Sequence, residues 1–168
     1  MAVDRREEAF EAFFLQHYER VVAIAYKVLG DRDAAEDVAQ EVFLSFHATV
    51  DPAVAWAPGW LWAAAAHRAL NAVRGSRRRR DRELRVLPGG AQETPEDLAV
   101  AAEQHAAVRA ALGRLPGRQA EILVLRAAGL SYAEIAAAVQ LKPTSIGTLL
   151  CRAEHALRKE LDHVLASH

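Results

Sequence analysis

The chain is poor in the residues that build cross-links, metal cages and membrane spans. It has one cysteine among 168 residues, which excludes an internal disulfide and a multi-cysteine zinc site. It contains no run of about 18 apolar residues and no basic start followed by a short apolar segment. We therefore expect neither a membrane span nor a signal peptide, and predict a cytoplasmic protein with no membrane insertion of its own. The alternation typical of β-strands is also missing.

The sequence also lacks the groupings that carry catalysis. No nucleophile is paired with a base, no carboxylates cluster with histidines, and no glycine-rich loop precedes a helix to hold phosphate. His17 lies on an apolar helical stripe, so we predict a packed core histidine rather than a ligand. These absences favour a protein that is not an enzyme and that uses no cofactor and no metal.

Charge is segregated along the chain although the net charge is only −1. Residues 1–67 hold 5 basic and 11 acidic residues, whereas residues 68–85 hold 8 basic and 2 acidic ones. Residues 86–104 hold 4 acidic residues and no basic one, and residues 105–168 hold 8 basic and 5 acidic ones. Blocks of alternating sign favour a chain that meets more than one kind of partner.

Apolar residues recur at helical spacing along most of the chain, and 52% apolar content is enough for buried cores. We expect an all-α fold of two small helical domains, a three-helix domain over 1–85 and a helical bundle over 105–168. Residues 86–104 form an acidic linker and the start of the next helix, and proline and glycine at 87–94 predict that the linker is flexible. Asp4 is the expected N-cap of a first helix over about 5–29, and Asp31 or Asp33 caps the second.

The stretch 130–152, LSYAEIAAAVQLKPTSIGTLLCR, has the layout of a helix-turn-helix. Ser131 and Glu134 form a capping signature, and Pro143 suits the first turn of the second helix. That helix is expected to bury five residues, Ile146, Leu149, Leu150, Ala153 and Leu157. Its other side carries Thr144, Thr148 and His155 beside Ser145 and Arg152, groups that suit base edges and phosphates in a major groove. Taken alone, the same pattern also fits an ordinary corner of a helical bundle.

Two further surfaces come from the first 85 residues. The predicted second helix shows Asp37, Gln40 and Glu41 with Leu44 beside them, which is either a solvated face or a protein-binding one. The third helix, starting at Pro58, carries a stripe suited to unpaired bases and their phosphates. The stripe consists of Trp60, His67, Asn71, Arg74 and Arg78, and the arginine run 77–80 extends it. We expect Trp62 simply to cover the bundle.

At this point the sequence resembles a known family. LGDRDAAEDVAQEVFLSF, WLWAAAAHRALNAVRGSRRRR and LGRLPGRQAEILVLRAAGLSYAEIAAAVQLKPTSIGTLLCRA occur in this order over nearly the whole chain. Together they resemble a bacterial RNA polymerase sigma factor of the extracytoplasmic-function group of the sigma-70 family, the compact kind with only regions 2 and 4.

The resemblance implies three binding surfaces and the partners for them. Core RNA polymerase would be bound through the coiled coil of its largest subunit by Asp37, Gln40, Glu41 and Leu44. The non-template strand of the minus-ten promoter element would be captured by Trp56, Trp60, His67, Asn71, Arg74, Arg77 and Arg78. The duplex minus-thirty-five element would be contacted by Lys142, Thr144, Ser145, Thr148 and Arg152. The acidic linker would pass through the polymerase active-site cleft and RNA exit channel, and an anti-sigma factor would regulate the protein.

The chain departs from the family pattern at several positions. His67 stands where asparagine is usual and Asn71 where aspartate is usual, which affects the expected base preference. Gly147 and Leu149 replace cations of the recognition helix, which predicts weaker phosphate anchoring, with help expected from Lys142 and Arg126. Cys151 is expected to be a small packed residue. The alternative hypothesis is a free-standing helix-turn-helix regulator that acts without stable polymerase association.

Overall fold

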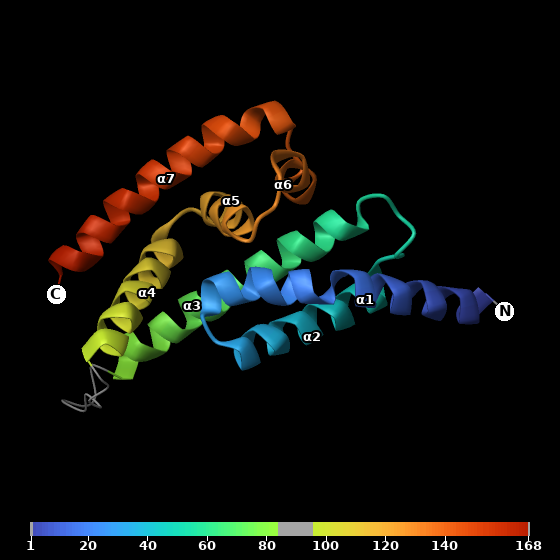
Figure 1. Ribbon diagram of the computed structural model, residues 1–168, viewed down its shortest axis with the longest axis horizontal. Coiled ribbons are helices and arrows are strands. Elements are labelled where there is room, and N and C mark those ends of the chain that lie inside the picture. Colours follow the sequence, from blue (N-terminus) through green and yellow to red (C-terminus); the bar gives the residue numbers. More distant parts are fainter. Residues whose placement is uncertain (1, 84–95, 168) are drawn as a thin grey trace.

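The computed structural model describes residues 2–83 and 96–167, and all of its regular elements within these ranges are helices. Figure 1 shows their arrangement. The helices are α1 (Ala2–Leu29), α2 (Arg32–Thr49), α3 (Ala57–Glu83), α4 (Glu96–Arg114), α5 (Gly117–Ala127), α6 (Tyr132–Val139) and α7 (Pro143–Ala166). The predicted all-α fold is confirmed. The predicted linker segment 86–95 lies outside the described residues.

Helices α1, α2 and α3 form the first domain around an aromatic core. The rings of Phe13 and Phe46 stack with centroids 4.8 Å apart and planes 6° from parallel, and Phe46 is fully buried. The apolar residues of α2 that recur at helical spacing predict its buried face, and all six are buried: Ala35, Val38, Ala39, Val42, Phe43 and Phe46. Helical periodicity therefore located this core correctly, because a surface helix buries the residues that recur every three or four positions.

The helix starts in this domain differ in how well local sequence predicts them. Asp31 is the N-cap of α2, and its carboxylate accepts a hydrogen bond from the amide of Ala34. The prediction that Asp4 caps α1 is wrong, since the helix begins at Ala2 and Asp4 lies within its first turn. A carboxylate there still interacts favourably with the positive end of the helix dipole. In sequence, an aspartate near the start of a helix fits both the N-cap position and the first turn, so the two cannot be told apart.

Helices α4 to α7 form the second domain, and α4 packs along α7. The reciprocal capping box of α6 is present, with the Ser131 hydroxyl bonded to the amide of Glu134 and the Glu134 carboxylate to the amide of Ser131. Gln140 ends α6 with a left-handed backbone at φ 57°, and Pro143 opens α7. The helix-turn-helix predicted from sequence is thus formed.

The two domains pack against each other and share one apolar cluster. Helix α3 contacts α4, α5 and α6, and α1 contacts α5. In Figure 1, α4 to α7 lie along one side of the three-helix domain. Arg20 of α1 makes two hydrogen bonds to the carboxylate of Glu134 in α6, at 3.1 and 2.7 Å. The sequence predicted the two sets of helices but not this contact between them, and the boundaries at 85 and 105 stay a prediction.

Candidate protein and nucleic-acid interfaces

Four exposed residues of α2 form a surface that we call the α2 acidic face: Asp37, Gln40, Glu41 and Leu44. Leu44, the last of the four along the helix, is 73% exposed. The Glu41 carboxylate accepts a hydrogen bond of 3.1 Å from Arg68 of α3, which also donates to the hydroxyl of Ser45 at 3.0 Å. Arg68 therefore holds Glu41 in place while leaving it open to a partner, a role that the sequence analysis did not assign.

The side chains predicted to bind a single strand lie along α3 and in the loop before it. We call Trp60, His67, Asn71, Arg74, Arg77 and Arg78 the α3 stripe. His67, Asn71 and Arg78 are exposed, whereas the other three are half-buried. Trp56 lies in the loop between α2 and α3 and is 57% exposed.

Three residues of the α3 stripe have partners, one of them within the first domain and two in the second domain. The ring of Trp60 packs against Phe46, with centroids 5.7 Å apart. His67 Nδ1 lies 3.8 Å from the Glu121 carboxylate of α5. Arg74 donates to the backbone carbonyls of Gly113 and Leu115 at 3.3 and 3.1 Å. The stripe is thus assembled along α3, but in this arrangement it is partly covered.

Trp62 belongs to the core and not to the stripe. It is only 7% exposed, and the Arg20 guanidinium lies 4.8 Å from the centre of its ring. The prediction that Trp62 covers the bundle is confirmed.

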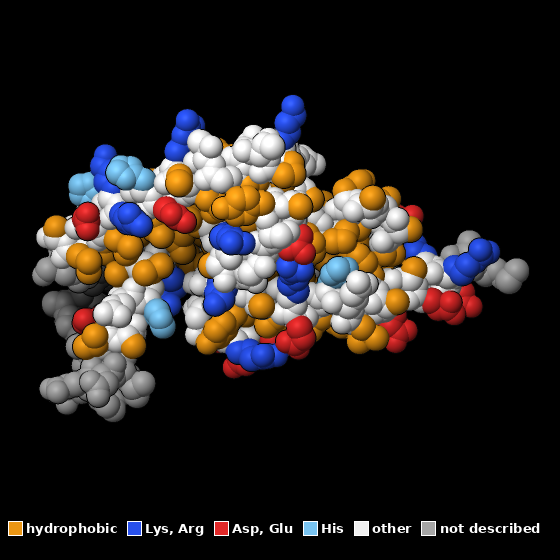
Figure 2. Space-filling model, turned by 45° about the horizontal axis from the view of Figure 1, so that its top comes forward, with side chains coloured by type: hydrophobic (Ala, Val, Ile, Leu, Met, Phe, Trp, Pro, Cys, Tyr) orange, Lys and Arg blue, Asp and Glu red, His pale blue; other side chains and the backbone are white. Residues whose placement is uncertain are grey.

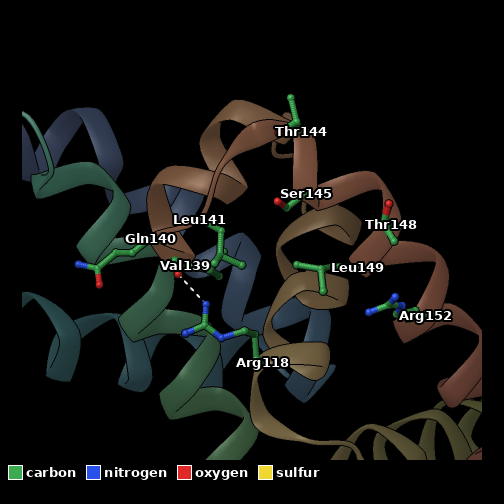
Figure 3. A pocket seen from close by; sticks show the side chains of 9 residues that line it. All are labelled: Arg118, Val139, Gln140, Leu141, Thr144, Ser145, Thr148, Leu149 and Arg152. Atoms are coloured by element: carbon green, nitrogen blue, oxygen red, sulfur yellow. Dashed lines mark hydrogen bonds between the residues drawn. The ribbon is translucent and has the colours of Figure 1, made fainter.

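We call the five residues predicted to contact a duplex the recognition face: Lys142, Thr144, Ser145, Thr148 and Arg152. All five are exposed. Four of them line an open groove of about 680 Å³ together with Arg118, Val139, Gln140, Leu141 and Leu149. Figure 3 shows the side chains of Leu141, Leu149 and Arg152 directed into the same space, while Gln140 points away from it. The groove thus combines hydroxyl groups and cations over an apolar floor.

Arg118 of α5 is a part of this groove that the sequence analysis missed. Its guanidinium donates a hydrogen bond of 2.7 Å to the carbonyl of Val139, the last residue of α6 (Figure 3). This bond supports the turn that leads into α7. Periodicity gave no sign of it, because the two residues belong to different helices.

Three predictions about α7 need correction. Cys151 is exposed, so the expectation of a small packed residue is wrong. Leu149 and Leu157 are half-buried, unlike the fully covered Ile146 and Leu150. These three positions lie near the edges of the apolar side of α7, where periodicity alone does not decide what neighbouring helices cover.

The pKa values of ionisable groups beside the domain contact are shifted in different directions. Hydrogen bonding by the Ser131 amide, with help from Arg20, lowers the pKa of Glu134. Burial raises the pKa of Glu121, although His67, Arg118 and Arg74 oppose that shift. Burial also lowers the pKa of His17, and Arg20 adds to the effect. The ring of His17 packs against that of Phe13, with centroids 4.4 Å apart and planes tilted by 53°, as expected for a packed histidine.

The space-filling view shows how charge is distributed over one face. In Figure 2, acidic side chains gather around the end where α1 begins, and basic and histidine side chains stand on the α7 side.

None of the described helices has the length and apolar character needed to cross a bilayer. Within residues 2–83 and 96–167, no group of three or more histidine, cysteine or acidic residues has a metal-binding arrangement.

Sequence profiles of two protein regions match this chain. The profile of Sigma-70 region 2 matches residues 13–79, and that of Sigma-70 region 4 matches residues 105–157. The first ends at residue 79, within the arginine run of α3, and the second contains the whole recognition face.

Curated relatives are similar over most of the chain. The ECF RNA polymerase sigma factor SigE of Mycolicibacterium smegmatis is 32% identical over 91% of this chain, which spans 60% of that protein's length. SigK of Mycobacterium tuberculosis is 28% identical, with 93% of this chain and 87% of SigK covered.

A solved structure shares the fold. It is the sigma factor RpoE of Bartonella quintana in complex with the anti-sigma factor NepR, with a TM-score of 0.50 and 24% identity. The match covers 91% of this chain and 96% of that one.

Proposed function

The chain belongs to the extracytoplasmic-function group of the sigma-70 family, and we propose that it is a promoter-specificity subunit of RNA polymerase. In this role it binds core polymerase, contacts the minus-thirty-five and minus-ten promoter elements and promotes opening of the duplex. It acts in the cytoplasm and has no catalytic role of its own, since bond formation belongs to the polymerase.

The observation that carries the proposal is the presence of two exposed surfaces of different chemistry in one chain. The α2 acidic face offers carboxylates around the apolar anchor Leu44, an arrangement suited to a protein partner. The recognition face offers Thr144, Ser145 and Thr148 for base edges, and Arg152 for phosphates. A protein that used only DNA would leave the first surface without a partner.

The α3 stripe suits the strand that is exposed when a promoter opens. Aromatic, imidazole and amide side chains stack on and hydrogen-bond to unpaired bases, and arginines neutralise the backbone. Extraction of a base from the duplex costs a few kcal/mol, which contacts in a pocket must offset. Trp56 and Asn71 are exposed and available for such contacts.

An anti-sigma factor is the proposed regulator. Exposed Leu44 and Trp56 and the apolar floor of the recognition groove favour a protein cover when polymerase is absent. The Bartonella quintana sigma factor of similar fold was solved in complex with an anti-sigma factor.

The test is in vitro transcription from fragments of the host genome by core polymerase, with and without the protein. A Leu44→Asp variant removes the apolar anchor, and Leu15→Asp is its matched control because Leu15 is also exposed, at 72%. We expect specific start sites with the wild type and the control, and none with Leu44→Asp. Binding of the fragments by the protein alone, with no effect of polymerase, would instead identify a free-standing operator-binding regulator.

A further inference from the structure

Three arginines of α3 line an open pocket beside the turn between α4 and α5. Arg74, Arg77 and Arg78 lie three and four positions apart, so their side chains project from the same face of the helix. The pocket has a volume of about 500 Å³, and Gly113 and Leu115 also line it. Helix α4 lies beside the second half of α3 (Figure 1). The pocket is therefore concave, with cations on one side and the end of α4 on the other.

These cations are not neutralised where they line the pocket. Among the described residues, those that line it include no acid. Neither Arg77 nor Arg78 forms an ion pair or a hydrogen bond with the part of the chain that the structure describes. Burial raises the pKa of the Glu121 carboxyl and Arg74 is among the cations that oppose this shift, but Glu121 does not line the pocket. A cleft lined by charges of one sign focuses the electric field and concentrates ions of the opposite sign.

Arg74 is held in place by the second domain. Its Nε and one terminal nitrogen, Nη2, donate to the carbonyls of Gly113 and Leu115 at 3.3 and 3.1 Å. The other terminal nitrogen, Nη1, takes part in neither bond, so its N–H groups remain available to an anion. A guanidinium that is positioned in advance loses little side-chain freedom when a ligand binds.

The chemistry of the pocket suits linked phosphate groups. A guanidinium matches the geometry of phosphate, to which it donates two hydrogen bonds at once. Three guanidinium groups around one pocket match a ligand that concentrates several negative charges in one place. A promoter strand spreads its charge along the backbone, one per phosphate, whereas a diphosphate or triphosphate holds its charges close together.

We propose that this pocket binds a small polyphosphate, an anion with two or three linked phosphate groups. Arg77 and Arg78 supply its main contacts, and Arg74 adds a third beside the turn between α4 and α5. Because the same arginines are assigned to the promoter strand, a bound polyphosphate and the strand compete for them. This competition rests on the proposed strand-binding role of α3, whereas the pocket itself stands on the residues that line it.

Isothermal titration calorimetry of the full-length protein with sodium triphosphate measures the affinity directly. Arg77→Gln removes a cation that lines the pocket and keeps the bonds of Arg74 to the second domain. Arg79→Gln is the matched control, because Arg79 belongs to the same helix and the same arginine run but does not line the pocket. Both variants lose one positive charge, so a difference between them reports the site and not the net charge. Circular dichroism verifies that both keep their helix content.

We expect saturable binding of triphosphate by the wild type. The affinity should be lower by about tenfold or more in Arg77→Gln, as for the loss of a hydrogen bond between charged groups. Arg79→Gln should stay within about twofold of the wild type, because salt screens a charge outside the pocket. Sulfate at the same ionic strength should not displace triphosphate, since it offers a single anionic group to three arginines.

A second measurement tests the competition with a strand. Fluorescence anisotropy follows a labelled oligothymidylate of about 12 nucleotides bound to the wild-type protein while triphosphate is added. We expect triphosphate to displace the oligonucleotide at concentrations near its calorimetric dissociation constant, and sulfate at equal ionic strength to leave it bound. An oligonucleotide that stays bound at saturating triphosphate would overturn the competition.

Three calorimetric results would overturn the pocket itself. One is the absence of saturable triphosphate binding, and another is an equal loss of affinity in the two arginine variants. The third is displacement of triphosphate by sulfate, which would identify a site for any anion. Saturable binding that depends on Arg77 supports the pocket even when the oligonucleotide does not bind. Failure of the strand-binding role and failure of the pocket are therefore distinguishable.

Discussion

Truncation of Leu44 to alanine isolates the apolar anchor of the α2 acidic face. Because the side chain is 73% exposed, its loss leaves no cavity and should change the free energy of unfolding by less than about 0.5 kcal/mol. If polymerase covers the exposed part, the lost burial is about 1–2 kcal/mol, given roughly 1.5–3 kcal/mol for a fully buried leucine. This corresponds to about a five- to thirtyfold weaker complex.

The assay is titration of fluorescently labelled protein into core polymerase, with urea unfolding measured in parallel. Leu15→Ala is the control, because Leu15 is 72% exposed on the neighbouring helix α1 and loses the same atoms. The two variants should have equal stability, whereas only Leu44→Ala should bind polymerase more weakly.

Equal polymerase affinity of the two leucine variants would refute the reasoning, since exposure and lost area are matched and only position differs. A loss of stability in Leu44→Ala would also count against it, because the structure gives this side chain no buried contacts to lose.

Three further predictions concern the recognition domain and the core. Ser131→Ala removes the α6 N-cap and should cost about 1 kcal/mol, seen calorimetrically as a melting temperature lower by roughly 2–4 °C. The pKa of His17 is lowered from 6.5 in the folded protein. As pH falls, the unfolded chain therefore binds a proton at this residue before the folded protein does. The contribution of neutral His17 to the free energy of unfolding is complete above about pH 6.5 and is lost as pH falls. Urea unfolding between pH 7.5 and 5.5 should accordingly show a greater loss for the wild type than for His17→Gln. Arg152→Ala should weaken duplex binding and reduce the slope of log affinity against log salt by about one, whereas Arg158→Ala, farther along α7, should leave that slope unchanged in the same titration.

The parts of the fold that sequence predicted are those set within one helix. The buried face of α2 follows from its own periodicity, and the α6 capping box follows from two residues three positions apart. The polar side of α7 was predicted in the same way, since the apolar and polar residues of this helix separate at helical spacing, whereas its role in contacting DNA stays a prediction.

Contacts between helices distant in sequence were not predictable in this way. Arg20 and Glu134 are separated by 114 positions, and each looked like an ordinary surface charge or a local cap. Arg118 likewise bonds to a carbonyl, and every residue has one, so no side-chain pattern marks the partner. Cys151 was misjudged because its exposure depends on what packs beside α7 and not on its own chemistry.

The Glu134 carboxylate accepts a hydrogen bond from the Ser131 amide at the start of α6 and, at the same time, binds Arg20 of the other domain. In a genetic selection for proteins with a weakened contact between the two domains, Arg20 and Glu134 are therefore not equivalent. Substitutions of Glu134 would damage the first turn of α6 along with the domain contact and would be eliminated with misfolded variants. The recovered mutations should accumulate at Arg20, whose replacement leaves the capping box intact. Mutations that loosen this contact would therefore be found in α1 and not in α6.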